Sequence, residues 1–165
     1  MIPDNIEKVE RYQHILFMDT TPSATNPTWS PVGIGITDLA ISYNPQVDIE
    51  KWVIEKNARS DHSGNEKQSS VTQKAYKNDP VFEFVAGARD ELNYKTQLLE
   101  VDVWNGSGTG TITYPAKKSA GKVVVTSYMG DNGQIEYDLY FEGDVEEGTV
   151  TIANGVPTFI PSASL

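Results

Sequence analysis

The chain has 165 residues, no cysteine, and 23 acidic against 13 basic side chains, which gives a formal net charge of -10. This length fits one domain that buries about 70% of the surface its unfolded chain exposes, so a core needs neither a disulfide nor a metal. The charge argues against a surface that grips nucleic acid through Lys and Arg, while the charged N-terminus and the short apolar runs argue against an export signal and a membrane span.

The first 28 residues show weak periodicity and end in a turn-rich run at 20–28, which predicts a poorly packed N-terminal arm. From Trp29 to Tyr43, apolar residues alternate, with a slip at Thr37 and Asp38 that is typical of a β-bulge. A second alternating run at 47–56 should pair with the first as a hairpin.

The segment 57–70 contains one apolar residue, Ala58, and is rich in Ser, Asn, Gly and charged residues. It cannot contribute to a core, so we expect a long, mobile surface loop. Loops of this length are usually functional or disordered, and both partner contact and idle surface remain open. Strand character returns at 71–77.

A single helix is predicted at 80–92. Asp79 can accept a hydrogen bond as its N-cap, and Pro80 suits the first helical position. One face of this helix is apolar and should lie on a sheet. The face consists of Val81, Val85, Ala88 and Leu92.

The rest of the chain reads as strands at 96–104, 109–114, 122–128, 134–145 and 148–153, with a hairpin turn at 131–133. The tail at 154–165 is apolar but contains two prolines, which predicts a second arm. We therefore expect one mainly β domain at 29–153 between two arms.

Catalytic candidates are few. The two histidines, His14 and His62, fall in the predicted arm and loop, where neither would be held rigidly for acid–base or nucleophilic chemistry. Two such histidines without a thiolate also make a poor zinc site. Glycines 106, 108 and 110 join two strands and lack the features of a phosphate-binding loop. We expect no enzymatic activity, no catalytic residues, no metal and no cofactor.

Paired carboxylates are the one signal that suggests an enzyme. Glu100 and Asp102 share a predicted strand face with Trp104, and a second face carries Glu136, Asp138, Tyr140 and Glu142. Same-face residues lie roughly 7 Å apart, which overlaps the carboxylate spacing of inverting glycosidases. Any half-buried antiparallel strand shows the same alternation. An acidic solvent face, a sugar-binding surface and a catalytic pair all remain open.

The order of elements resembles a known family. A Trp-containing start is followed by the strand Gly-Ile-Gly-Ile-Thr-Asp-Leu at 33–39, then Ser-Tyr-Asn-Pro at 42–45 and Trp-Val-Ile-Glu-Lys-Asn at 52–57. A polar loop, one helix and a closing hairpin around 143–151 complete the pattern. Over residues 25–153 this is similar to the major tail proteins, or tail tube subunits, of long-tailed bacteriophages of the siphophage type.

The resemblance implies a β-sandwich or barrel-like fold of two packed antiparallel sheets with one flanking helix, a long hairpin loop and extended terminal arms. It also implies hexameric rings that stack into a tube for DNA ejection, with the tape measure, tail terminator and distal tail proteins as further partners. The subunit would be made in the host cytoplasm and would act in the virion tail, without contacting a membrane.

Regional assignments follow from the resemblance. The loop residues expected to reach an adjacent ring are Arg59, Asp61, His62, Asn65, Glu66 and Lys67. Acids that would line the bore and let DNA pass without specific binding are Glu136, Asp138 and Glu142. The C-terminal arm would contact other subunits through Phe159, Ile160 and Leu165. The alternative hypothesis is a carbohydrate-binding or receptor-facing β-sandwich module that uses Trp104 or Tyr140.

Overall fold

The computed structural model describes residues 5–163, and it is mainly β, with 52% strand and one α-helix, α1 (Pro80–Gly87). The strands of this described part are β1 (His14–Asp19), β2 (Trp29–Pro31), β3 (Pro45–Glu50), β4 (Arg59–Asn65), β5 (Gln68–Lys74), β6 (Tyr94–Asp102), β7 (Tyr114–Tyr128), β8 (Gln134–Ala153) and β9 (Val156–Pro161). Short 3-10 turns lie at η1 (Arg11–Gln13) and η2 (Val103–Asn105). The mainly β, antiparallel prediction is confirmed.

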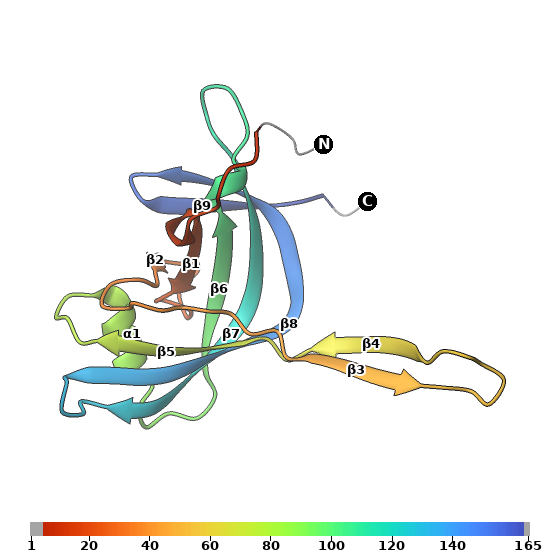
Figure 1. Ribbon diagram of the computed structural model, residues 1–165. Coiled ribbons are helices and arrows are strands. Elements are labelled where there is room, and N and C mark those ends of the chain that lie inside the picture. The colour runs from red at the N-terminus through yellow and green to blue at the C-terminus, as the bar shows by residue number, and fades with distance from the viewer. Residues whose placement is uncertain (1–4, 164–165) are drawn as a thin grey trace.

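Seven strands form one antiparallel sheet in the order β2-β1-β6-β7-β8-β5, and β9 pairs with the C-terminal half of β8. This sheet curls until it is nearly a barrel (Figure 1). The segment between β2 and β3 helps to close it, because Lys74 donates its backbone N–H to Gly35 and Ser42 exchanges backbone hydrogen bonds with Gln68. The body is thus one curled sheet, where two packed sheets were expected.

The curvature is concentrated in β7 and β8, the two longest strands (Figure 1). Their pairing shifts register between Lys118 and Ala120 and again between Val125 and Ser127, and such bulges bend a strand. Gly121 lies in the same region, and a Cβ there would lie 2.8 Å from the Leu98 side chain of β6. The close approach of β6 and β7 at this point requires glycine.

The interior holds two apolar clusters. The larger packs the buried face of α1 against the sheet, and the smaller lies under the β8–β9 hairpin. Their centres are Leu16, Met18, Val81, Val85, Leu98, Ile135, Tyr137 and Leu139 in the larger cluster, and Phe17, Leu99, Val101, Ala116 and Val150 in the smaller. Burial of these side chains supplies most of the driving force for folding.

Helix α1 starts as predicted and ends early. Asp79 accepts a hydrogen bond from the Val81 N–H at 3.2 Å, and Pro80 occupies the first helical turn. The helix stops at Gly87, and Leu92, which was expected on its buried face, is 91% exposed. The cause is local: Gly87 lowers helix stability by about 1 kcal/mol, and after Ala88 the chain continues with the charged residues 89–91.

The predicted N-terminal arm is wrong for β1. Leu16, Phe17 and Met18 are fully buried, because β1 lies between β2 and β6 in the main sheet. A strand covered on both faces carries a continuous apolar run, which lacks the alternation used to detect strands.

The predicted C-terminal arm is also wrong for the described residues. Asn154 and Gly155 both have positive φ and form a tight two-residue turn, after which β9 folds back along β8. Strand β9 pairs with β8 on one side. Its two prolines, Pro157 and Pro161, have no backbone N–H, and an edge strand tolerates this because no further strand needs a donor on its outer side.

Several predicted strands have different bounds. The alternating segment at 29–43 keeps only β2 as a strand, and 109–114 is largely a loop in which Gly110 has positive φ. The runs at 134–145 and 148–153 are one continuous strand, β8. The turn at 131–133 is confirmed between β7 and β8. Strand β3 pairs with β4, which follows it, and not with the segment before it.

Candidate assembly interface

Strands β3 and β4 form a two-stranded sheet of their own, which projects far from the body (Figure 1). Every residue of β3 is exposed, and so is every residue of β4 except Gly64, which is half-buried. An isolated two-stranded hairpin is at best marginally stable in water. The projecting hairpin therefore presents two faces and two strand edges that the described chain leaves uncovered.

The predicted mobile loop at 57–70 is wrong in form. Residues 59–65 are paired as β4, and residues 68–70 begin β5 in the main sheet. Sequence patterning could not detect β4, because a strand with both faces in solvent needs no apolar alternation. Its pairing comes from β3, whose register runs from Pro45 opposite Asn65 to Glu50 opposite Arg59.

The hairpin has one face with exposed apolar residues. Val47 lies opposite His62, and Ile49 lies opposite Ser60. Directly opposite residues share a face, and Val47 and Ile49 are 47% and 73% exposed. This face could be buried against another surface at little desolvation cost.

The other face of the hairpin is acidic. Asp48 lies directly opposite Asp61, and Glu50 lies opposite Arg59. Two like charges in a cross-strand pair destabilise the hairpin in isolation. The two faces of the hairpin are therefore chemically distinct.

We call residues 43–45 and 65–67, where the chain enters and leaves the hairpin, its root. Lys67, which follows β4 by two residues, anchors the root in the body. Its ammonium pairs with the Glu100 carboxylate of β6 and lies 4.5 Å from the Phe141 ring and 5.2 Å from the Tyr43 ring. Tyr43 lies two residues before β3, the other strand of the hairpin. Both partners of the ion pair are buried, with side-chain exposures of 10% and 8%, so this contact fixes the point from which the hairpin leaves the barrel.

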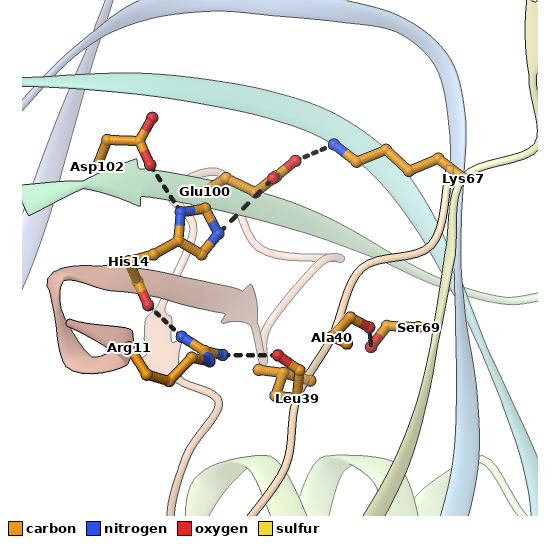
Figure 2. Close-up of polar contacts among 8 residues, drawn as sticks. All are labelled: Arg11, His14, Leu39, Ala40, Lys67, Ser69, Glu100 and Asp102. Atoms are coloured by element: carbon orange, nitrogen blue, oxygen red, sulfur yellow. Dashed lines mark hydrogen bonds and ion pairs between the residues drawn. The ribbon is translucent and has the colours of Figure 1, made fainter. Parts of the chain in front are cut away.

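Glu100 also connects the root to the N-terminal segment (Figure 2). His14 places Nδ1 2.7 Å from Oδ1 of Asp102 and Nε2 3.8 Å from Oε2 of Glu100. Arg11 donates to the carbonyl oxygens of His14 and Leu39, at 2.7 and 2.9 Å. His14 is therefore held firmly, contrary to the expectation from its place in a predicted arm.

A neighbouring contact fixes the strand beside this cluster. The Ser69 hydroxyl of β5 donates to the Ala40 carbonyl oxygen at 2.7 Å (Figure 2). Sequence reasoning recognised that Glu100 and Asp102 lie near each other. It missed His14 and Lys67 as their partners, because these residues lie more than thirty positions away and only the sheet order brings them together.

The six residues predicted for inter-ring contact divide into two groups. Arg59, Asp61, His62 and Asn65 lie on β4 of the projecting hairpin, where His62 Nε2 is 2.9 Å from Asn65 Oδ1. Glu66 and Lys67 lie at the root, and Lys67 points into the body. Of the first group, Arg59, Asp61 and His62 lie away from the body, whereas Asn65 is paired with Pro45 at the base of the hairpin.

The three acids predicted to line a bore lie on β8, on the outer surface of the curled sheet. Asp138 accepts a hydrogen bond from the Ser70 hydroxyl at 2.7 Å, and Glu142 forms an ion pair with Lys122 at 2.7 Å. Glu136 is exposed. On this part of β8, Glu142 is therefore neutralised by a lysine, whereas Glu136 is not paired with a basic side chain of the described chain.

The residues predicted for a C-terminal arm lie mainly within the fold. Phe159 packs against the smaller core cluster, with the Lys118 ammonium 4.8 Å from its ring centre. Ile160 is 53% exposed on β9, and Leu165 is outside the described residues. Phe159 is thus partly buried within this chain, and its contact to another subunit stays a prediction.

The proposed sugar platform does not form as expected. Strand β6 ends at Asp102 and Trp104 belongs to η2, so Trp104 does not continue the strand face of Glu100. Glu100 is itself buried in the ion pairs described above. Tyr140 remains 38% exposed on β8.

Across residues 5–163, no helix has the length and apolarity needed to cross a bilayer.

Comparison with known proteins adds no relationship: no family model matches the chain, and no curated protein matches it.

Proposed function

We propose that this chain is a structural, non-enzymatic subunit that assembles with copies of itself into hexameric rings, which stack as the tail tube of a long-tailed bacteriophage. The subunit would be made in the host cytoplasm and would reside in the virion tail. The tape measure, tail terminator and distal tail proteins would be its other partners, and DNA would pass through the tube without specific binding.

The projecting hairpin of β3 and β4 is the observation that carries this proposal. A hairpin that is exposed on both faces gains stability when another surface covers it, and the main sheet fixes its direction through Lys67 and Glu100. A projection of this kind suits contact between identical subunits, because each copy offers both a projection and a body to receive one.

Electron microscopy of the purified protein tests the proposal. We expect rings or tubes of uniform diameter whose abundance rises with protein concentration. Particles that remain monomeric over all concentrations and ionic strengths, by sedimentation and by microscopy, would contradict self-assembly.

A hairpin-deleted variant supplies the matched comparison. Pro45 and Asn65 are directly paired, so replacing residues 46–64 with Asn-Gly should close the root without disturbing Lys67. We expect a folded monomer, with the circular dichroism and cooperative melting of the intact protein, that forms no tubes. Tubes from this variant would show that the hairpin is dispensable.

A further inference from the structure

The end of the hairpin differs in charge from the rest of the chain. We define the tip as residues 51–59, which contain the three basic residues Lys51, Lys56 and Arg59 and the single acid Glu55. The tip thus carries +3 - 1 = +2, and the remaining residues carry -10 - 2 = -12. Lys51 and Lys56 form no ion pair with the residues that the structure describes.

The tip is also pre-organised. The Glu55 carboxylate pairs with Arg59 and accepts the backbone N–H of Trp52 at 3.4 Å, while the Glu55 N–H donates to the Trp52 carbonyl oxygen at 2.9 Å. The Arg59 guanidinium stacks over the Trp52 ring, 4.0 Å from its centre. Because these contacts are already formed, docking would lose less conformational entropy than it would for an unstructured loop.

The tip holds apolar residues where a turn ordinarily holds polar ones. Val53 and Ile54 occupy the turn and are 103% and 87% exposed, and Trp52 is 52% exposed. Turns favour Gly, Pro, Asn, Asp and Ser. Apolar residues in a turn, with no packing contact in the described chain that compensates for them, are expected mainly at functional positions.

From these observations we propose that the tip is a docking element, and that its partner is an acidic, partly apolar surface on a second copy of this chain. Val53, Ile54 and Trp52 are buried in the contact, and Lys51 and Lys56 are attracted to carboxylates of the partner. Charge complementarity favours a second copy as the partner, since the tip has a net charge of +2 and the rest of each chain has a net charge of -12. The inference rests on the proposed self-assembly and adds its mode of attachment.

A charge-reversal pair tests the electrostatic part. The test variant is Lys51→Glu with Lys56→Glu, and the control is Lys77→Glu with Lys95→Glu. All four lysines are exposed, and both variants change the net charge equally. We expect the critical concentration for assembly, measured by light scattering, to rise about tenfold or more for the test variant and to change little for the control.

Salt provides an independent readout on the same proteins. Added NaCl should weaken assembly of the wild-type protein and of the control, while the test variant should show a shallower salt dependence. Equal assembly and equal salt response in both variants would overturn the inference and leave self-assembly itself standing. A wild-type protein that does not assemble would instead remove the proposed function.

Cross-linking identifies the partner. The chain has no cysteine, so Val53→Cys creates a single site for a photo-reactive maleimide on the exposed turn. We expect irradiation of assembled protein to join residue 53 to a peptide of another copy, distinguished by mixing isotope-labelled and unlabelled subunits. Assembled protein that gives no cross-link between copies would overturn the proposal.

Other occupants are tested on the wild-type protein and the two charge-reversal variants. Duplex DNA and phosphatidylglycerol vesicles are the alternative acidic probes for a cationic, apolar tip. Co-sedimentation with either probe that is lost in Lys51→Glu with Lys56→Glu, and kept in the Lys77 and Lys95 control, would assign the tip to that partner and contradict docking on a second copy.

Discussion

Single residues decide how the hairpin is attached. Lys67 and Glu100 form a buried ion pair, and the second oxygen of Glu100 faces His14. Burying two charges is costly unless each remains paired, so removing one partner leaves an uncompensated charge in the interior. The pair thus explains the direction of the hairpin better than any sequence preference of β3 or β4 does.

We expect Glu100→Gln to lower the free energy of unfolding by about 3 kcal/mol, because the Lys67 ammonium loses its carboxylate. Lys67→Met combined with Glu100→Leu should recover much of this loss, since no buried charge remains from the pair. Urea unfolding of the single and double variants measures both values. A loss under about 0.5 kcal/mol for Glu100→Gln would show that the pair is solvated.

A second buried polar chain joins β5, α1 and β8. Tyr137 donates to Gln73 Oε1 at 3.0 Å, and Gln73 Nε2 donates to Asp79 Oδ2 at 2.7 Å. Burial, with a smaller contribution from the Asp79 charge, holds the pKa of Tyr137 well above its usual range. The phenol therefore remains protonated and continues to donate.

Tyr137→Phe should destabilise the protein by about 1–3 kcal/mol, because the buried Gln73 oxygen loses its donor. Tyr76→Phe is the matched control, since Tyr76 is 51% exposed and its change should cost under about 0.5 kcal/mol. Thermal melting with urea titration checks both. Similar losses in the two variants would contradict the role of the hydrogen bond.

Asp79 should make stability depend on pH. Burial raises its pKa above 3.8, and the nearby Glu83 adds to this, while hydrogen bonds from Val81, Phe82 and Gln73 oppose it. The folded state then holds a proton that the unfolded chain has released, so the contribution of Asp79 to stability falls as pH rises from below 3.8 through the raised pKa.

The matching variant is Asp79→Asn, which retains a side-chain oxygen as N-cap but does not titrate. We expect the unfolding free energy of the wild type minus that of the variant to decrease with pH across this window and to level off above it. Urea titrations between about pH 3 and 7 measure the difference. A difference that is constant or rises with pH would contradict the raised pKa.

At the level of elements, β9 shows how a proline-containing tail becomes part of a sheet. Its pairing with β8 depends on Gly148, where a Cβ would overlap the Ile160 carbonyl oxygen and lie 2.7 Å from the Phe159 ring. Phe159 in turn packs on the smaller core cluster. The close contact of β8 with β9 therefore sets both the edge of the sheet and one end of the interior.

Gly148→Ala should push β9 away from β8 and lower the free energy of unfolding by about 1–3 kcal/mol, a typical cost of overpacking. Gly33→Ala is the control, since a Cβ there meets nothing within 4 Å and Gly33 has no positive φ. Hydrogen exchange of the β9 amides, with melting temperature, distinguishes the two. Unchanged protection of β9 in Gly148→Ala would show that the strands tolerate the added methyl group.

For the whole molecule, the distribution of charge matters more than its total. The proposed tube would place Glu136 and Asp138 toward the bore, where carboxylates repel the phosphates of passing DNA. Lys122 already neutralises Glu142, so the first two acids carry the proposed effect.

Tubes of Glu136→Lys with Asp138→Lys should retain DNA that wild-type tubes release, and the retention should fall steeply with added salt. Filter binding of labelled DNA to purified tubes measures this, with tubes of Asp90→Lys and Glu91→Lys as a charge-matched control on the exposed segment after α1. Equal retention by the two sets of tubes would remove these acids from the bore.

The sequence by itself determined those features that depend on neighbouring residues. The start of α1 at Asp79 and Pro80, the turn at 131–133 and the alternation of β8 were all readable, because capping, turn formation and one-sided burial leave a local pattern. The same is true of the paired acids Glu100 and Asp102, which were recognised without their partners.

Only the tertiary structure decided the rest. Strand β1 is buried on both faces and β4 on neither, so neither shows the alternation that a half-buried strand displays. The cluster of His14, Lys67 and Glu100 joins three segments through sheet order, which no local pattern encodes. The resemblance implied a long hairpin loop, but the residues themselves did not reveal the pairing of β3 with β4, because β4 is exposed on both faces and shows no apolar alternation.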